Sequence, residues 1–307
     1  MKTTEKLTLI QKITGLPQEK LADKLGVSFA TLNSWINGRS LPRKKTSERI
    51  DLLYKECTGQ KIIPTEILEA KKALIINKSK SIKNAIKIIH KNPDIRDEFM
   101  LSLTYNTNRI EGSTLTEPET AAILFNNTAL PNKSLIEQME VKNHQAALNF
   151  LLNNITELGM IDEVFILKLH GMLMNGIRDD AGFYRRHQVR IAGANVPTAN
   201  YIKVPVLMHD LIKNIHIRPK DLISHISAIH SNFEKIHPFS DGNGRIGRLL
   251  IHAMAFKHNI PPAIIKQEKR HLYYTYLNKA QLQDDITLLE DFLCDAFLDG
   301  FNIIERK

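Results

Sequence analysis

The chain has 307 residues, of which 43% are hydrophobic and 24% charged, with a formal net charge of +9 at pH 7, so it suits about two domains with ordinary buried cores. No apolar run approaches the roughly 18 residues of a membrane span and the N-terminus lacks a signal-peptide core, which predicts a cytoplasmic protein with no membrane partner. The two cysteines, Cys57 and Cys294, lie far apart without metal-ligand spacing, which argues against a disulfide framework or a zinc site.

The positive charge is concentrated in the N-terminal third. Residues 1–92 hold 19 Lys+Arg and 8 Asp+Glu, a net of +11, and the remaining 23 basic and 25 acidic residues give −2. This asymmetry indicates that the N-terminal third meets a polyanion, with a solvated basic surface as the alternative.

Residues 18–42 predict a helix, a tight turn at Gly26 and a second helix that Ser28 can cap. The segment resembles the helix-turn-helix of phage-repressor-like (Xre-type) DNA-binding domains, including its Trp35–Gly38 ending. The resemblance implies that the second helix enters the major groove of double-stranded DNA, although such folds also serve as protein-interaction modules. The residues expected to face bases are Phe29, Ala30, Asn33 and Ser34, and those expected to meet phosphates are Ser28, Thr31, Arg39, Arg43 and Lys44.

Residues 59–92 contain a lysine-rich stretch with isoleucines at helical spacing. We interpret them as a connector that passes into an amphipathic basic helix. The sequence leaves open whether that helix packs on the rest of the chain or extends a nucleic-acid surface.

From Asp94 the pattern is helical, and Gly112 marks a helix end that places Glu111 in the last turn. A negative charge is unfavourable there unless a cation compensates it. Thr116–Glu119 predicts a capping box that opens the next helix. Further helices are expected around 134–153 and 163–174.

Residues 181–206 alternate between β-prone runs and turn residues, which predicts a β-hairpin. Its expected strands are Val189–Ile191 and Tyr201–Val204.

Residues 237–248, HPFSDGNGRIGR, form a loop between two runs of helical periodicity. The backbone of Gly242–Gly244 and the start of the following helix predict an anion cradle suited to phosphates. Arg245 and Arg248 share one flank of that helix, and Asp241 is an oxygen ligand suited to Mg²⁺. His237 can act as a base near neutral pH. A dinucleotide fold is rejected because the loop follows a helix rather than a strand.

Two more helices are expected at 269–281 and 287–304, after Pro261–Pro262. Tyr273, Tyr274 and Leu277 are candidates for an adenine pocket, with ordinary core packing as the alternative.

The 237–248 segment matches every defined position of the Fic family motif, HxFx[DE]GNGRxxR, so the chain resembles that family. The resemblance implies transfer of AMP from ATP, with Mg²⁺, to a hydroxyl side chain (Ser, Thr or Tyr) of a target protein. It implies His237 as the catalytic base, Asp241 as the metal ligand, and a nucleotide site made of Phe239, Gly242, Asn243, Gly244, Arg245 and Arg248.

Thr107–Gly112 resembles the [ST]xxxE[GN] inhibitory motif of Fic proteins, with Thr107, Glu111 and Gly112 at its defined positions. The resemblance implies that Glu111 pairs with Arg248 and prevents a productive pose of the ATP γ-phosphate. The hairpin lies where the family carries a target-docking flap, which implies docking roles for Val189, Arg190, Ile191, Tyr201, Ile202 and Lys203.

We therefore predict an all-α fold, a Fic-type helical core with a small β-hairpin flap, behind a small helical helix-turn-helix domain. The expected domains are 1–58 (helix-turn-helix), 59–92 (basic connector) and 93–307 (catalytic, with the inhibitory helix). Two alternatives stay open: removal of AMP from a modified protein by means of Glu111, and a transcription regulator whose core senses nucleotide. The target protein, the operator and the oligomeric state are not determined by the sequence, and a homodimer stays open.

Overall fold

The computed structural model describes residues 1–155, 160–190 and 196–306, and in these ranges it is built from helices. The helices are α1 (Thr3–Thr14), α2 (Gln18–Leu25), α3 (Phe29–Ile36), α4 (Lys44–Cys57), α5 (Thr65–Ser81), α6 (Ala85–Lys91), α7 (Pro93–Glu111), α8 (Glu117–Asn126), α9 (Leu135–Asn154), α10 (Glu163–Leu173), η1 (Tyr201–Lys203), α11 (Val204–Ile215), α12 (Leu222–Ile236), α13 (Asn243–Lys257), η2 (Gln267–Lys269), α14 (Arg270–Gln283) and α15 (Thr287–Ile304). The all-α prediction is confirmed. No helix in the described ranges is long and apolar enough to cross a membrane.

Helices α1–α4 form a small module with a hydrophobic core of its own. Leu7 and Ile10 of α1 pack there with Leu32 and Trp35 of α3 and Ile50 of α4. The predicted local chemistry is present: Gly26 has a φ of 69°, and the Ser28 side chain accepts a hydrogen bond from the Thr31 amide at the start of α3. The helix–turn–helix prediction for residues 18–42 therefore holds.

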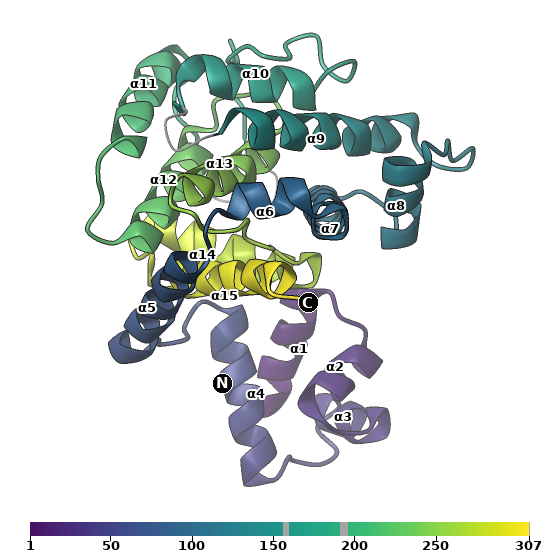
Figure 1. The fold of residues 1–307 in the computed structure, drawn as a ribbon. Helices are drawn as coiled ribbons and strands as arrows, with labels where there is room; N and C mark the ends of the chain where they lie inside the picture. The colour runs from purple at the N-terminus through teal and green to yellow at the C-terminus, as the bar shows by residue number, and fades with distance from the viewer. Residues whose placement is uncertain (156–159, 191–195, 307) are drawn as a thin grey trace.

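The remaining helices share a second, larger core centred on the α12–α13 hairpin. Helix α13 contacts α7, α9, α10 and α12, and α12 also packs against α11, α14 and α15. In Figure 1, α9 and α10 lie above this hairpin and α15 below it, with the N-terminal module beneath α15. The loop between α12 and α13, which carries the HPFSDGNGRIGR segment, is thus held on several sides by other helices.

The basic connector is two helices rather than one, and α5 packs on α15. Asn84 interrupts the helical pattern because its side chain caps the Lys87 amide and opens α6. Two lysines of α5 are paired with carboxylates of α15: Lys71 lies 2.5 Å from Asp291, and the buried Lys72 lies 2.8 Å from Glu290. These charges fix α5 to the larger core, which answers the question that the sequence left open.

The predicted second strand, Tyr201–Val204, is wrong. Residues Tyr201–Lys203 form the 3-10 helix η1, and Val204 begins α11. The Asn200 side chain accepts a hydrogen bond from the Ile202 amide, and Pro205 lies in the first turn of α11, where its fixed φ favours a helix. In the other half, Val189 is not in a strand, and its carbonyl accepts a hydrogen bond from the Thr198 hydroxyl. Ile191 lies outside the described residues.

Candidate functional site

The α12–α13 loop is a tight connection fixed by its own side chains. His237 ends α12 with a left-handed φ of 52°, and Gly242 opens α13 with a φ of 78°. The buried Asn243 amide closes the loop on Phe239, because it accepts from the Phe239 N–H (2.9 Å) and donates to the Phe239 carbonyl (2.8 Å). The first amides of α13 are thereby held at one end of a helix dipole, which favours anions.

Phe239 anchors the loop in the core through His170 of α10. The two rings are stacked, with centroids 3.7 Å apart. The His170 Nδ1 accepts from the Gly182 amide, so its Nε2 carries the proton and donates to the Asp241 carbonyl at 3.1 Å. Burial lowers the pKa of His170 to about 4, which keeps the ring neutral. Sequence reasoning assigned no role to His170, since only tertiary packing brings it to the loop.

Arg185 holds the other end of the loop. Its buried guanidinium donates to the carbonyls of His237 (2.7 Å), His187 (2.8 Å), Ala199 (2.5 Å) and Ile236 (3.3 Å). Five donors in a fixed fork suit this task. Arg185 lies in the segment 181–206 for which the sequence predicts a hairpin, but nothing in the sequence indicates these carbonyl partners.

The His237 imidazole has one ring nitrogen that can accept a proton. Its Nδ1 lies 3.3 Å from the Glu234 carbonyl, and a proton on Nδ1 leaves the Nε2 lone pair free to accept one. Burial is the main cause that lowers the pKa of His237. The hydrogen bond to the Glu234 carbonyl raises the pKa, and the positive charge of Arg185 lowers it. The ring lines a cleft.

Arg248 does not line that cleft and is only 3% exposed, because α7 covers it. Its Nη2 donates to Glu111 Oε1 at 2.5 Å, and its Nε donates to the Thr107 hydroxyl at 2.7 Å. Burial would lower the pKa of Arg248, but the charge of Glu111 outweighs it and raises the pKa further above its ordinary value. The expected pairing of Glu111 with Arg248 is therefore present in the structure, together with Thr107.

Glu111 also lies over the start of α13. A side chain at Gly244 would overlap Glu111 Oε1 before any other atom. The carboxylate thus occupies space beside the first turn of α13, where an anionic phosphate would otherwise meet the helix.

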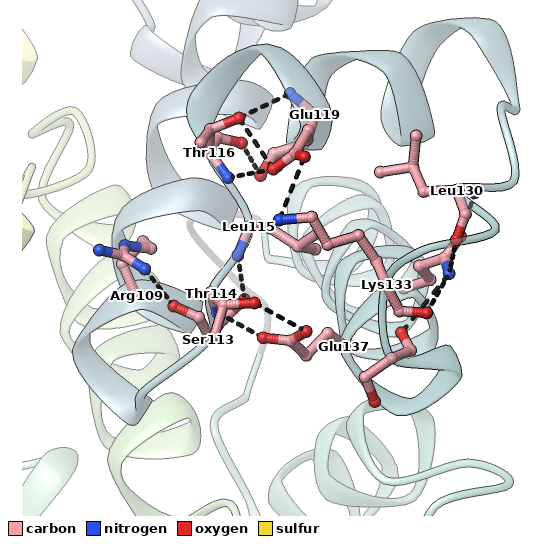
Figure 2. Close-up of polar contacts among 12 residues, drawn as sticks. Arg109, Ser113, Thr114, Leu115, Thr116, Glu119, Leu130, Lys133 and Glu137 are labelled. Carbon is pink, nitrogen blue, oxygen red and sulfur yellow. Dashed lines mark hydrogen bonds and ion pairs between the residues drawn. The ribbon is translucent and has the colours of Figure 1, made fainter.

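The segment after Glu111 is tied down at several points (Figure 2). Gly112, with a φ of 109°, ends α7, and Arg109 donates to the Ser113 carbonyl. The Thr114 hydroxyl donates to Glu137 of α9 at 3.2 Å. The predicted capping box of Thr116 and Glu119 is formed, and Glu119 also pairs with Lys133 at 3.1 Å. These contacts fix the end of α7 and hence the position of Glu111.

Arg245 is buried and paired with Glu140 of α9 at 2.6 Å, and it lies 3.7 Å from Asp241. The sequence alone assigns no role to Glu140. Asp241 itself is half exposed at the cleft, and its Oδ1 accepts from the Gly242 amide at 2.6 Å. No group of three His, Cys, Asp or Glu side chains in the described ranges could hold a metal ion by itself. A single exposed carboxylate fits Mg²⁺ that arrives with nucleotide phosphates.

The cleft has a volume of about 880 Å³, which suits a small-molecule or cofactor site. Residues 240–244 of the α12–α13 loop, with Glu111 and His237, form one part of it. Helix α14 forms another through residues that include Tyr273, Tyr274 and Leu277. Arg190 lines the cleft, whereas Tyr201, Ile202 and Lys203 are exposed and lie outside its lining.

The predicted DNA-contact residues lie on the outer side of the N-terminal module. Phe29 is 46% exposed, and Ser28, Ala30, Arg39, Arg43 and Lys44 are also exposed. Asn33 and Ser34 are partly buried: the Asn33 amide donates to Gln18, and Ser34 bonds Ser40. The two thus have partners within the module.

Two family models match the chain. The Fic/DOC family model matches residues 160–255, and a helix-turn-helix model matches residues 14–58.

Curated relatives named protein adenylyltransferase Fic are similar to part of the chain. The protein of Nematostella vectensis is 34% identical over 194 residues, which are 59% of this chain and 43% of the relative. The protein of Drosophila erecta is 28% identical over 222 residues, 70% of this chain and 45% of the relative. Protein adenylyltransferase fic-1 of Caenorhabditis briggsae is 32% identical over 197 residues, 62% and 38% respectively. The chain therefore spans less than half the length of each of these relatives.

Solved structures share the fold. Fic-1 from C. elegans aligns with a TM-score of 0.66 at 22% identity over 93% of this chain and 84% of that one. A Fic domain containing signalling protein from Bacteroides thetaiotaomicron aligns with a TM-score of 0.67 at 22% identity, over 76% and 97% respectively.

Proposed function

We propose that this chain, which matches a Fic/DOC family model over residues 160–255 and a helix-turn-helix model over residues 14–58, is a protein adenylyltransferase held in an inhibited state by Glu111. The observation that carries the proposal is the geometry of the loop. A neutral His237 lies beside the glycine-containing start of α13, and Glu111 accepts a hydrogen bond from Arg248 of the same helix. Similarity to relatives named protein adenylyltransferase supports the same reaction.

In the proposed reaction a Ser, Thr or Tyr oxygen of a target protein attacks the α-phosphorus of ATP. His237 Nε2 takes the hydroxyl proton, the new O–P bond forms, and the bond between the α-phosphorus and its bridging oxygen breaks to release pyrophosphate. The α13 amides at Gly242–Gly244 would stabilise the charge that develops on the phosphate oxygens. Asp241 would hold the Mg²⁺ that neutralises the leaving group.

Inhibition follows from the hydrogen bonds that Arg248 already makes with α7. The guanidinium donates from Nε to Thr107 and from Nη2 to Glu111, and Nη1 has no partner in the described ranges. The two contacts hold the group against α7, outside the lining of the cleft. The Glu111 carboxylate would in addition repel an incoming polyphosphate across the same space. The γ-phosphate is therefore excluded from the pose that leaves the α-phosphorus in line with the target oxygen.

The target protein would approach over Val189 and Arg190, beside the cleft that holds His237. The proposal places the protein in the cytoplasm, where ATP and Mg²⁺ are available.

Mass spectrometry of the Glu111→Gly protein, after incubation with each nucleoside triphosphate and Mg²⁺, tests the proposed reaction. We expect an AMP adduct on a hydroxyl side chain, formed with ATP and absent when His237→Ala is added. An adduct from another nucleotide, or none from any nucleotide, would contradict the proposal.

We also propose that the N-terminal module binds double-stranded DNA. The match of residues 14–58 to a helix-turn-helix model and the exposed Arg39, Arg43 and Lys44 beside α3 support this. Binding to DNA upstream of its own coding region should weaken as salt rises, because phosphate contacts release counterions. Salt-independent binding, or none, would contradict the proposal and leave the module as a protein-interaction domain.

A further inference from the structure

The N-terminal module reaches the cleft of the larger core. Helix α4 contacts α14, and the Thr275 hydroxyl lies 3.5 Å from the Cys57 carbonyl at the end of α4. A side chain at Gly59 would meet Thr275 at 3.2 Å, so the backbone approaches α14 closely there. Helix α1 lies beside α4 in Figure 1, and Lys6 pairs with Asp51 at 2.7 Å. The end of α1 is thereby carried to α14.

Five consecutive residues at that end, Lys12–Leu16, line the same cleft as His237 and the α13 start. Gly15 turns the chain with a φ of 65°, and a side chain there would meet nothing within 4 Å. Leu16 is partly buried yet does not belong to the hydrophobic core of the module. Its apolar side chain therefore lines the cleft and does not pack in the interior of the module.

The backbone of this segment also offers hydrogen-bond acceptors. The Gly15 amide bonds the Gln11 carbonyl, the Leu16 amide bonds the Thr14 hydroxyl, and Pro17 has no N–H to donate. No donor in the described ranges bonds the carbonyls of Lys12, Ile13 or Thr14. A helix end leaves such carbonyls available to water or to a ligand.

We propose that Lys12–Leu16 forms the wall of the nucleotide site at its nucleoside end, so that the helix-turn-helix module is a structural part of the catalytic cleft. This inference rests on the proposed function and adds to it. The phosphates are assigned to the α13 start, so the base and ribose must extend into the rest of the cleft, which α14 and Lys12–Leu16 share. An adenine ring has apolar faces and an exocyclic amine, which match Leu16 and the free carbonyls.

Lys12 adds a positive charge to this wall in the last turn of α1, where a cation is favourable. Arg190 and Arg270 line the cleft as well, against the carboxylates of Glu111, Glu234, Asp241 and Glu268. Burial raises the pKa of Glu234 to about 8, so this carboxyl is mostly protonated at pH 7 and adds little negative charge. The cleft can therefore accept a polyanionic nucleotide.

The test measures binding of α,β-methylene ATP with Mg²⁺ to the full chain by calorimetry. This analogue binds without transferring AMP, because a methylene replaces the oxygen of the bond that would break. The Glu111→Gly protein serves as the parent. Leu16→Ala and Lys12→Gln should each raise the Kd at least fivefold. The matched controls Leu41→Ala, an 80% exposed leucine of the same module, and Lys20→Gln, an exposed lysine of α2, should leave the Kd within twofold.

A second measurement leaves the wall residues intact. Hydrogen exchange of the Glu111→Gly protein, followed by mass spectrometry, should show slower exchange in peptides that cover residues 12–16 when the analogue and Mg²⁺ are added. Unchanged Kd values in the wall variants together with unchanged exchange would overturn this inference and leave the proposed function intact. Absence of any binding by the analogue would overturn both.

Discussion

The carboxylate of Glu111 lies 2.5 Å from the guanidinium of Arg248, although 137 positions separate the two residues in the chain. The pair joins the end of α7 to α13. Arg248 is buried, so its charge needs a partner in either state, and Glu111 or a nucleotide phosphate can provide one. Arg248 is thus a cation for which two anions can compete.

Thr107→Val should activate the enzyme partially. The variant removes the hydroxyl that accepts from Arg248 Nε at 2.7 Å but keeps the side-chain volume. One hydrogen bond fewer then holds the Arg248 guanidinium against α7, so the rate of AMP transfer should rise about three- to tenfold, which corresponds to about 1 kcal/mol, the usual worth of one hydrogen bond.

Thr120→Val is the matched control, because this buried threonine bonds only the Thr116 carbonyl of its own helix. Thr120→Val should lower the free energy of unfolding by about 1 kcal/mol, the worth of one hydrogen bond, without raising the rate of AMP transfer. Equal rates in parent and Thr107→Val would show that Thr107 does not help to hold Arg248 away from the nucleotide.

Arg185→Lys should reduce both transfer and stability. A lysine ammonium cannot replace the planar fork that donates to four carbonyls, including that of His237. We expect a loss of about 2–4 kcal/mol in the free energy of unfolding, since buried carbonyls lose their donors, and at least a tenfold lower rate in the Glu111→Gly background. Arg186→Lys, at an exposed neighbouring position, should change neither quantity, and a normal rate in Arg185→Lys would contradict this role.

The rate of transfer should persist at mildly acidic pH. The pKa of His237 lies below its ordinary value of 6.5, so the base stays unprotonated at pH 6.5, and the rate falls only as the pH drops through the lowered pKa. Initial rates of the Glu111→Gly protein at fixed ATP and Mg²⁺, from pH 8 to pH 5, check this. A half-maximal rate at pH 7 or above would mean that His237 is not held neutral.

The folded state should lose stability as the pH falls from 7 to 5. Burial lowers the pKa of His170 to about 4 and those of His230 and His252 to about 3, whereas each is near 6.5 in the unfolded chain. The unfolded state therefore binds more protons below pH 6.5, and stability is lost as the pH falls. Glu234, with a pKa raised to about 8, opposes the change, because its protonated form is the folded one.

Together these groups predict a net loss of about 3 kcal/mol between pH 7 and pH 5. Urea unfolding at both pH values measures it. His252→Gln should flatten the dependence, because one buried neutral histidine is removed. Greater stability at pH 5 than at pH 7 would contradict the assignment of neutral buried histidines.

The helices and the turn at 237–248 could be predicted from the local sequence. Helix α15 spans Thr287–Ile304 as predicted, and Gly112, Ser28 and the Thr116–Glu119 box mark ends that depend on nearby residues alone. The glycines of 237–248 likewise predicted a turn between two helices, because their backbone freedom is a local property.

The residues that hold the loop and its arginines in place could not be predicted from local sequence. Arg185, His170 and Glu140 act on carbonyls, rings and charges that come from other parts of the chain. The strand prediction at Tyr201–Val204 is wrong because the Asn200 side chain and the fixed φ of Pro205 favour a helix start over the alternating pattern. The place of Lys12–Leu16 in the cleft depends on the packing of α4 on α14, which no local pattern encodes.

The most direct test of the account is transfer from α-³²P-labelled ATP with Mg²⁺ in three proteins: the parent, Glu111→Gly, and Glu111→Gly combined with His237→Ala. Glu117→Gly, a change at an exposed glutamate of α8, serves as the control. The account predicts at least tenfold more label on protein in Glu111→Gly than in the parent or the control, and none in the double variant. Equal labelling of parent and Glu111→Gly would contradict inhibition by Glu111, and labelling that survives His237→Ala would contradict the proposed base.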